Sequence, residues 1–193
     1  MIKQFVYDNE KVEQIAHHFN EILKLIGEDP EREGLQKTPQ RAAKALLENT
    51  WGYKQDNEQI LKAAIFSHPG SQMVVVKDIE FYSLCEHHIL PFFGTMSIGY
   101  IPDGEIVGLS KLARIVDGYA RRLQVQERLT MQVCDLVHST LANKGVIVTC
   151  EAQHLCMKMR GVEKQQSTTV TMQCRGDFED PALQRQFFNL IGK

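Results

Sequence analysis

The chain has 193 residues, of which 43% are hydrophobic and 24% are charged, and its formal net charge at pH 7 is −2. This length can bury the core of one domain, and the composition is that of a globular protein rather than a fibrous or disordered one. The small negative charge argues against a nucleic acid or an anionic membrane as partner, and no run of about 18 apolar residues predicts a membrane span.

The first residues and the cysteines bear on the cellular compartment. The segment from Met1 to Gln4 opens no apolar run of the kind found in signal peptides, so we expect the protein in the cytoplasm. Stable disulfides are rare there, and the five cysteines are an odd number. Metal binding or simple burial is therefore the better expectation for the thiols.

Hydrophobic periodicity predicts helices in the first third of the chain. Apolar residues recur at three- and four-residue steps over 12–26 and stop at Gly27. A second helix is predicted with Thr38 as its N-cap and Pro39 at its first position, and a third, shorter helix over Glu58–Phe66.

The segment 68–71, His-Pro-Gly-Ser, breaks the helical pattern, so we place the change to β-structure there. The change divides the chain into an N-terminal helical region, 1–70, and a second region, 71–193. We expect the two regions to form a single functional unit. In the second region two strands, two helices and two more strands are predicted in turn, over Met73–Phe81, Gly94–Tyr100, Ser110–Leu123, Leu129–Leu141, Val146–Met159 and Thr168–Met172.

This order of elements predicts an α+β fold with an antiparallel four-stranded sheet and packed helices. Such a sheet has two open edges, which are an aggregation hazard unless they are paired or covered. Pairing with neighbouring subunits would remove both edges.

Two short segments, 85–88 and 154–156, hold five potential zinc ligands of the thiolate and imidazole types that zinc prefers. The first is expected on a loop, where Cys85 and His88 can close on one ion. In the second, a strand would direct His154 and Cys156 from one face, and Arg160 as well if the strand continued regularly.

Two thiolates and one imidazole, from Cys85, His88 and Cys156, would leave the fourth tetrahedral position to water, as in catalytic zinc sites. His87 and His154 would then be available to carry protons near neutral pH. Spacing alone leaves two alternatives open, which are a closed structural zinc site and no metal at all.

The remaining cysteines and histidines carry no such pattern. The cysteines lie in predicted regular elements and are interpreted as packed thiols, and the histidines as surface or core residues. They are Cys134, Cys150, Cys174, His17, His18, His68 and His138.

Basic residues at a predicted helix start form a second candidate site. Ser110, Lys111 and Arg114 open a helix, where backbone N–H groups and the helix dipole favour an anion such as a phosphate. The alternative is that Lys111 and Arg114 are only solvated charges. Arg41 and Lys44, on the second predicted helix, are open to both interpretations.

Gln126 and Glu127 lie between the two middle helices. A carboxylate can accept the paired N1–H and N2–H donors of guanine, which adenine does not supply in that arrangement. A glutamate near a helix start is also a favourable partner of the helix dipole.

Taken in order, these segments resemble the GTP cyclohydrolase I family from about Gly34 to Phe178, with no functional position altered. The first 33 residues are left to the general helical interpretation. The matching stretches are Thr38–Lys44, Cys85–His88 with Pro91–Gly94, Gly108–Arg114, Gln124–Thr130, His154–Met157 and Met159–Gly161.

The resemblance implies the tunnelling fold (T-fold), in which the sheets of neighbouring subunits join into a barrel and two pentamers stack into a homodecamer. It implies the conversion of GTP and water to formate and 7,8-dihydroneopterin triphosphate, the entry to folate and tetrahydropterin biosynthesis. The implied cofactor is Zn²⁺.

Carried over residue by residue, the resemblance implies zinc at Cys85, His88 and Cys156, with proton transfer by His87 and His154. Glu127, with Gln126, would recognise guanine. The triphosphate would be held by polar and basic residues, Ser110, Lys111, Arg114 and Arg160, with Arg41 or Lys44 reaching over from a neighbouring subunit.

Two rival hypotheses come from other classes. A related tunnelling-fold nitrile reductase of deazapurine metabolism works through a nucleophilic cysteine and a nicotinamide cofactor without zinc, and the pairing of Cys85 and His88 with Cys156 argues against it. A purine- or pterin-binding regulator with structural zinc would need four protein ligands on the ion.

Overall fold

The computed structural model describes residues 5–193. The segment from Met1 to Gln4, which the sequence analysis used to predict a cytoplasmic location, lies outside the described residues. The chain forms two compact units, of which the first ends at Trp51 and the second covers Gly52–Lys193. Within the described residues, no helix combines the length and the apolar character needed to cross a bilayer.

The first unit consists of two packed helices, α1 (Asn9–Leu25) and α2 (Thr38–Asn49). The Asp8 side chain accepts a hydrogen bond from the backbone N–H of Lys11 and caps α1, which therefore begins before the apolar stripe. Thr38 is the first helical residue of α2 rather than its N-cap. The two helices meet around the buried residues Val12, Ala16 and Ala43.

The second unit begins with α3 (Asn57–Lys62), after a short 3₁₀ turn at Trp51–Lys54. The predicted third helix is too long, because Phe66 belongs to β1 (Ile65–Ser67) and pairs with Ile106 of β4 (Glu105–Val107). Strand pairing over three residues replaces the last helical turn. α3 packs against α4 of the same unit.

The main sheet has five strands in the order β5-β2-β3-β6-β7, one more than predicted. The four long strands are antiparallel neighbours, and β5 adds two residues parallel to the end of β2. A two-residue strand shows no hydrophobic periodicity that a sequence pattern could reveal. The strands are β2 (Val74–Cys85), β3 (Pro91–Pro102), β5 (Leu123–Gln124), β6 (Asn143–His154) and β7 (Thr169–Gly176).

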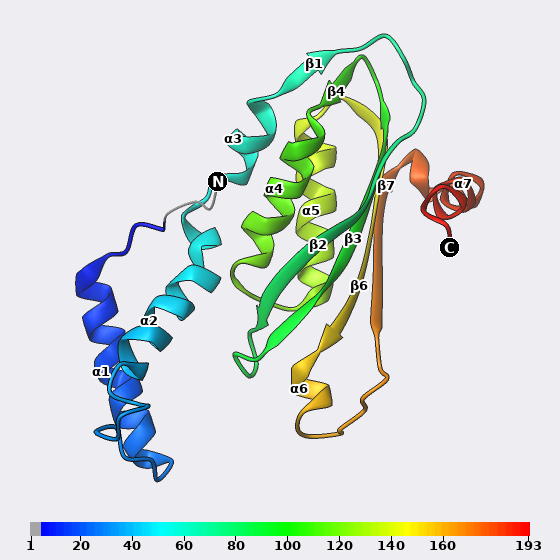
Figure 1. Ribbon diagram of the computed structural model, residues 1–193. Helices are drawn as coiled ribbons and strands as arrows, with labels where there is room; N and C mark the ends of the chain where they lie inside the picture. The colour runs from blue at the N-terminus through cyan, green and yellow to red at the C-terminus, as the bar shows by residue number, and fades with distance from the viewer. Residues whose placement is uncertain (1–4) are drawn as a thin grey trace. The chain divides into compact units, whose positions relative to one another are not determined.

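Two helices, α4 (Leu109–Ala120) and α5 (Gln126–Thr140), cover one face of this sheet (Figure 1). Their apolar sides and the strand residues beneath them form the largest buried cluster, which includes Phe92, Met96 and Ile98. Ser110 does not cap α4 as predicted, because the N-cap is Gly108.

The opposite face is covered at one end by α7 (Pro181–Ile191), after a 3₁₀ turn at Asp177–Glu179 (Figure 1). Phe187 of α7 is fully buried there against Phe178 and Ile147. The sequence analysis did not predict this helix, although Asp180 caps it and Pro181 opens it.

Candidate metal centre

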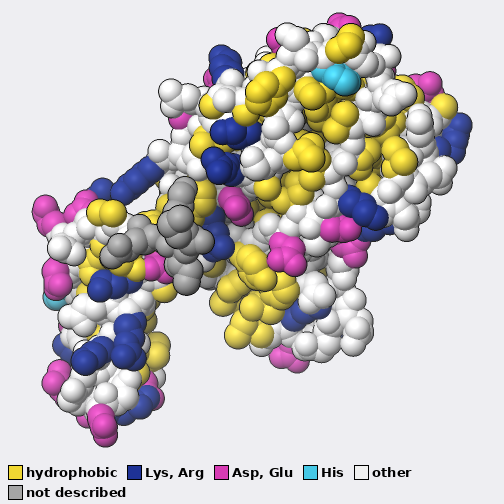
Figure 2. All heavy atoms as spheres, turned by 45° about the horizontal axis from the view of Figure 1, so that its top comes forward, with side chains coloured by type: hydrophobic (Ala, Val, Ile, Leu, Met, Phe, Trp, Pro, Cys, Tyr) yellow, Lys and Arg dark blue, Asp and Glu magenta, His cyan; other side chains and the backbone are white. Residues whose placement is uncertain are grey.

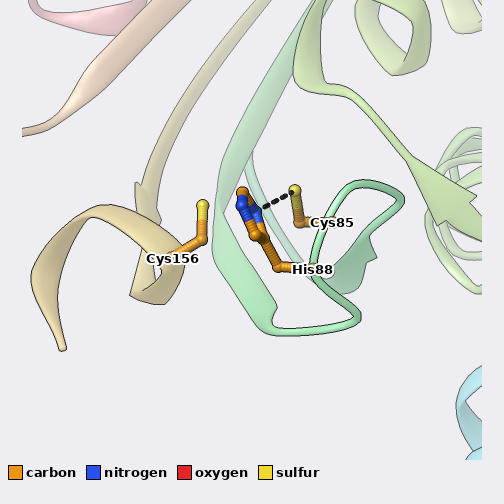
Figure 3. A group of neighbouring side chains, drawn as sticks. All are labelled: Cys85, His88 and Cys156. Atoms are coloured by element: carbon orange, nitrogen blue, oxygen red, sulfur yellow. Dashed lines mark hydrogen bonds between the residues drawn. The ribbon is translucent and has the colours of Figure 1, made fainter. Parts of the chain in front are cut away.

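Three predicted metal ligands converge in the second unit. One ligand atom from each of Cys85, His88 and Cys156 can be chosen so that all three lie within 4.8 Å of one another. Figure 3 shows the three side chains directed toward a common point, from the end of β2, the loop that follows it and α6. The structure thus brings together residues that are about seventy positions apart in the sequence.

A tight turn after β2 positions the first two ligands. Cys85 is the last residue of β2, and its backbone N–H donates to the carbonyl of Leu90 at 2.8 Å. Ile89 donates back to the carbonyl of Cys85 at 2.8 Å and has a φ of +55°, in the left-handed region. The turn folds His88 back, so that its Nδ1 lies 3.8 Å from the Cys85 Sγ.

Cys156 reaches the centre in a different way from the one predicted. The strand β6 ends at His154, and Cys156 lies in the single helical turn α6 (Leu155–Lys158). The pairing of β6 with β3 ends at Phe92, which pairs with His154, and the next residue of β3, Pro91, has no backbone N–H to donate. The prediction that His154, Cys156 and Arg160 share one strand face is therefore wrong, and Arg160 is an exposed residue after α6.

The ligand set fits a zinc ion. Tetrahedral zinc with Zn–S of about 2.3 Å and Zn–N of about 2.0 Å requires S···N separations of about 3.6 Å, and the Cys85–His88 separation is 3.8 Å. No fourth His, Cys, Asp or Glu among residues 5–193 belongs to the group. Burial and the nearby Cys85 thiol raise the pKa of Cys156, and a bound cation would offset both effects.

His87 lies beside this group but outside it. Its side chain is 64% exposed, with Nδ1 at 3.9 Å from the Cys85 Sγ and Nε2 at 3.9 Å from a Glu86 carboxylate oxygen. Glu86 is in turn bound by Arg128 of α5, whose hydrogen bond lowers the pKa of that carboxyl group. Arg128 also donates from Nε to Gln124 at 2.9 Å.

Sequence reasoning assigned no role to Arg128 or Gln124, although both lie in a stretch that carries the family resemblance. Gln124 is 1% exposed, and its backbone carbonyl accepts from the N–H of Glu86 at 3.0 Å. Together the two residues tie the metal-ligand turn to α5.

His154 is held on two sides. Its ring stacks on Phe92 with the centroids 4.7 Å apart and the planes at 2°, and its Nε2 lies 2.8 Å from the Gln126 Oε1. Burial lowers the pKa of His154, and the negative charge of Glu127 opposes that shift. Glu127 itself is exposed in the first turn of α5.

Gln126, which the sequence analysis grouped with Glu127 for recognition of guanine, points into the protein. Its side chain is 1% exposed, and its carboxamide nitrogen lies within 3.2 Å of three oxygen atoms of this chain. Its carboxamide oxygen is engaged by His154. Both ends of the amide are therefore committed to internal contacts.

The predicted phosphate-binding residues fall in three places. Ser110 and Lys111 lie in the first turn of α4, which has no side-chain cap, and Arg114 is exposed one turn later. Arg160 follows α6. The last two residues of the prediction, Arg41 and Lys44, lie on α2 of the first unit, where Lys44 stands 5.1 Å from the centre of the Tyr7 ring.

Comparisons with known proteins agree over nearly the whole chain. The family model described as GTP cyclohydrolase I matches residues 15–192. A protein named GTP cyclohydrolase 1 from Porphyromonas gingivalis is 55% identical over 184 residues, which cover 95% of this chain and 95% of that protein. One of the same name from Bacteroides fragilis is 52% identical over 180 residues and covers 93% of each.

Among solved structures, the crystal structure of the archaeosine synthase QueF-Like in the apo form covers 54% of this chain and 93% of that chain. The TM-score is 0.43 and the sequence identity is 20%. A likeness at this level does not define the fold.

Replacing one of the three ligands tests the metal centre. Cys156→Ala is expected to weaken zinc binding by at least roughly 100-fold, beyond the 10- to 100-fold typical of outer-shell partners, because only two ligands remain. The matched control is Cys174→Ala, which removes another partly buried thiol outside the group. Zinc retained per chain against a competing chelator is the measurement, and equal retention by the two variants would contradict the assignment.

Proposed function

Because this chain belongs to the GTP cyclohydrolase I family, we propose that it converts GTP and water to formate and 7,8-dihydroneopterin triphosphate at the centre formed by Cys85, His88 and Cys156. The observation that carries the proposal is the convergence of these three side chains from two distant segments of the sequence. Each segment also contains a further histidine, His87 in the first and His154 in the second. The product is the entry compound of folate and tetrahydropterin biosynthesis.

The donor set favours zinc as the metal. Two thiolates and one imidazole suit Zn²⁺, and a group of three protein ligands leaves a position for water. When bound, zinc supplies a Lewis acid that activates water for attack on the purine ring.

The residues of the chain then position the base and move protons. Opening the imidazole ring of guanine requires a proton at its N7, and later steps, in which the ribose rearranges and the pterin ring closes, need further transfers. His154 and His87 are the proton carriers in this proposal. His154 is half-buried and held in place by Phe92 and Gln126, whereas His87 is exposed.

Glu127 is proposed to recognise guanine through its N1–H and N2–H donors. Its carboxylate is exposed in the first turn of α5, directly after Gln126, whose amide contacts His154, so a purine bound by Glu127 would lie on the same side of the protein as that ring. We assign the contact to Glu127 alone, since the Gln126 amide is committed inside the protein.

Ser110, Lys111 and Arg114 are proposed to hold the triphosphate, with Arg160 from the segment after α6. The uncapped first turn of α4 offers backbone N–H groups to an anion, and lysine and arginine add charge-assisted hydrogen bonds. Arg41 and Lys44 are proposed to contribute from a neighbouring subunit.

The enzyme hypothesis is tested directly with GTP. Zinc-replete protein is expected to release formate and build up a pterin absorbance, and a chelator is expected to stop both. His154→Ala should keep its zinc and lose turnover by roughly 10²- to 10⁴-fold, the usual contribution of a general acid–base group, whereas Cys156→Ala should lose both. Absence of turnover in zinc-replete protein would remove the hypothesis, and equal metal loss in the two variants would reverse the roles.

Recognition of the base and of the phosphates can be separated with inosine triphosphate, which lacks the 2-amino group. Glu127→Gln should narrow the preference for GTP over this analogue by roughly 10- to 100-fold, the range for a lost hydrogen bond to a charged group. Lys111→Ala should raise KM for both nucleotides by the same factor, because it meets only phosphate. Unchanged base preference in Glu127→Gln would exclude its proposed role.

The sheet edges lead us to propose assembly into a T-fold barrel and a homodecamer of two stacked pentamers. Within the described residues, no strand pairs with the outer edge of β7, and β5 covers only Leu84 and Cys85 of β2. Val170 and Met172 of β7 are 64% and 44% exposed. Figure 2 shows one face of the molecule, on which hydrophobic side chains form several surface patches. Positively and negatively charged side chains lie between these patches.

The mass of the protein in solution tests this assembly. The wild-type chain is expected to form a particle of about ten subunits, and Val170→Lys should shift it to smaller species, because a charge would be buried at the joined edge. Val162→Lys, with a similarly exposed valine outside the sheet, is the matched control. A monomeric wild-type protein would exclude the proposal.

A further inference from the structure

The surroundings of Gln126 determine which way its amide points. The carboxamide nitrogen lies 3.0 Å from the backbone oxygen of Cys150 and 3.0 Å from that of Thr169. Backbone carbonyls can only accept hydrogen bonds, so the group that faces them must be the donor NH₂. In the opposite orientation the amide oxygen of Gln126 would face both carbonyl oxygens without a hydrogen between them. That repulsion would not be relieved by water, because Gln126 is only 1% exposed.

A closed chain of hydrogen bonds fixes the same direction independently. The Thr130 hydroxyl donates to the backbone carbonyl of Gln126 at 2.8 Å, which uses its one proton. The Thr171 hydroxyl must therefore donate to Thr130, at 2.7 Å, which leaves its oxygen only as an acceptor 3.2 Å from the Gln126 NH₂, where it shares a proton with one of the two backbone carbonyls. Reversing the amide would set its oxygen against the Thr171 hydroxyl oxygen with no proton between them, because the one Thr171 proton already goes to Thr130.

This orientation constrains His154. The Gln126 Oε1 is an acceptor with no proton of its own, so the His154 Nε2 at 2.8 Å must be the donor. In a neutral imidazole the proton then lies on Nε2, and Nδ1 carries the free lone pair. The parallel stack on Phe92 limits rotation of the ring out of that plane.

We propose that Gln126 is a positioning residue that holds His154 as its Nε2–H tautomer, so that proton exchange with the substrate passes through Nδ1. The inference rests on the proposed function for the identity of the substrate, but the tautomer itself is a property of the protein alone. It also replaces the contact between Gln126 and guanine with a contact to the proton carrier.

The tautomer is measured on the zinc-loaded protein, without substrate, from the ¹⁵N chemical shifts of its labelled histidines, with His154→Ala used to assign the signal. The His154 ring is expected to show a protonated Nε2 and an unprotonated Nδ1. A ring protonated on Nδ1 alone would overturn the proposal, whatever the outcome of the GTP assay.

Kinetics separate positioning from substrate binding. Gln126→Met keeps the length of the side chain but removes the acceptor, so the tautomer should become mixed and kcat should fall roughly 10- to 100-fold, as for other orienting partners of reactive histidines. KM for GTP and zinc content should stay within about twofold of the wild type. A rise in KM with kcat unchanged would instead favour the guanine contact and overturn the proposal.

Thr130→Val is the matched control for loss of a buried hydrogen bond. It removes a hydroxyl from the same ring of hydrogen bonds but leaves the contacts of Gln126 with Cys150, Thr169 and His154. Its thermal stability should fall while the His154 tautomer is retained. If Gln126→Met retains the tautomer as well, or if both variants lose kcat equally, Gln126 has only a structural role.

Discussion

The antiparallel ladder between β3 and β6 is the constraint on which the rest of the site depends. Its last pair joins Phe92 to His154, and beyond that pair β3 offers only Pro91, which has no backbone N–H to donate. The chain therefore turns into α6 and carries Cys156 toward the end of β2, where Cys85 directly follows Leu84, the residue that pairs with Pro91 of β3. The metal ligands gather where the ladder ends, and the place at which pairing stops determines which residues can meet.

Burial divides the residues around this centre into two kinds. Gln124 and Gln126 are 1% exposed, and a buried amide must satisfy its donors and acceptor within the protein, so each is fixed in one orientation. His87 and Glu127 are exposed, and their polar atoms remain available to a ligand. The buried amides can therefore orient neighbouring groups accurately, but they have little capacity left to bind a substrate themselves.

The sequence predicted the α+β class and the three clustered ligands because both depend on residue type. Thiol and imidazole groups are rare enough for their spacing to be informative, and apolar periodicity marks elements as long as α4 and α5. The errors concern properties set by tertiary pairing. Neither the end of β6 at His154 nor the two-residue β5 can be read from periodicity, since both depend on where a neighbouring strand begins or ends.

The inward orientation of Gln126 was missed for the same physical reason. In the sequence Gln126 and Glu127 are adjacent polar residues at a helix start, and nothing local distinguishes their directions. The difference arises because Thr169 and Thr171 of β7 and Cys150 of β6 lie beneath the first turn of α5 and offer acceptors to only one of the two side chains. The acid was left at the surface because those acceptors would repel a carboxylate, whereas an amide can donate to them. The adjacent pair thus combines a group suited to orient His154 with a group suited to meet a base, and exchanging the two residues would satisfy neither requirement.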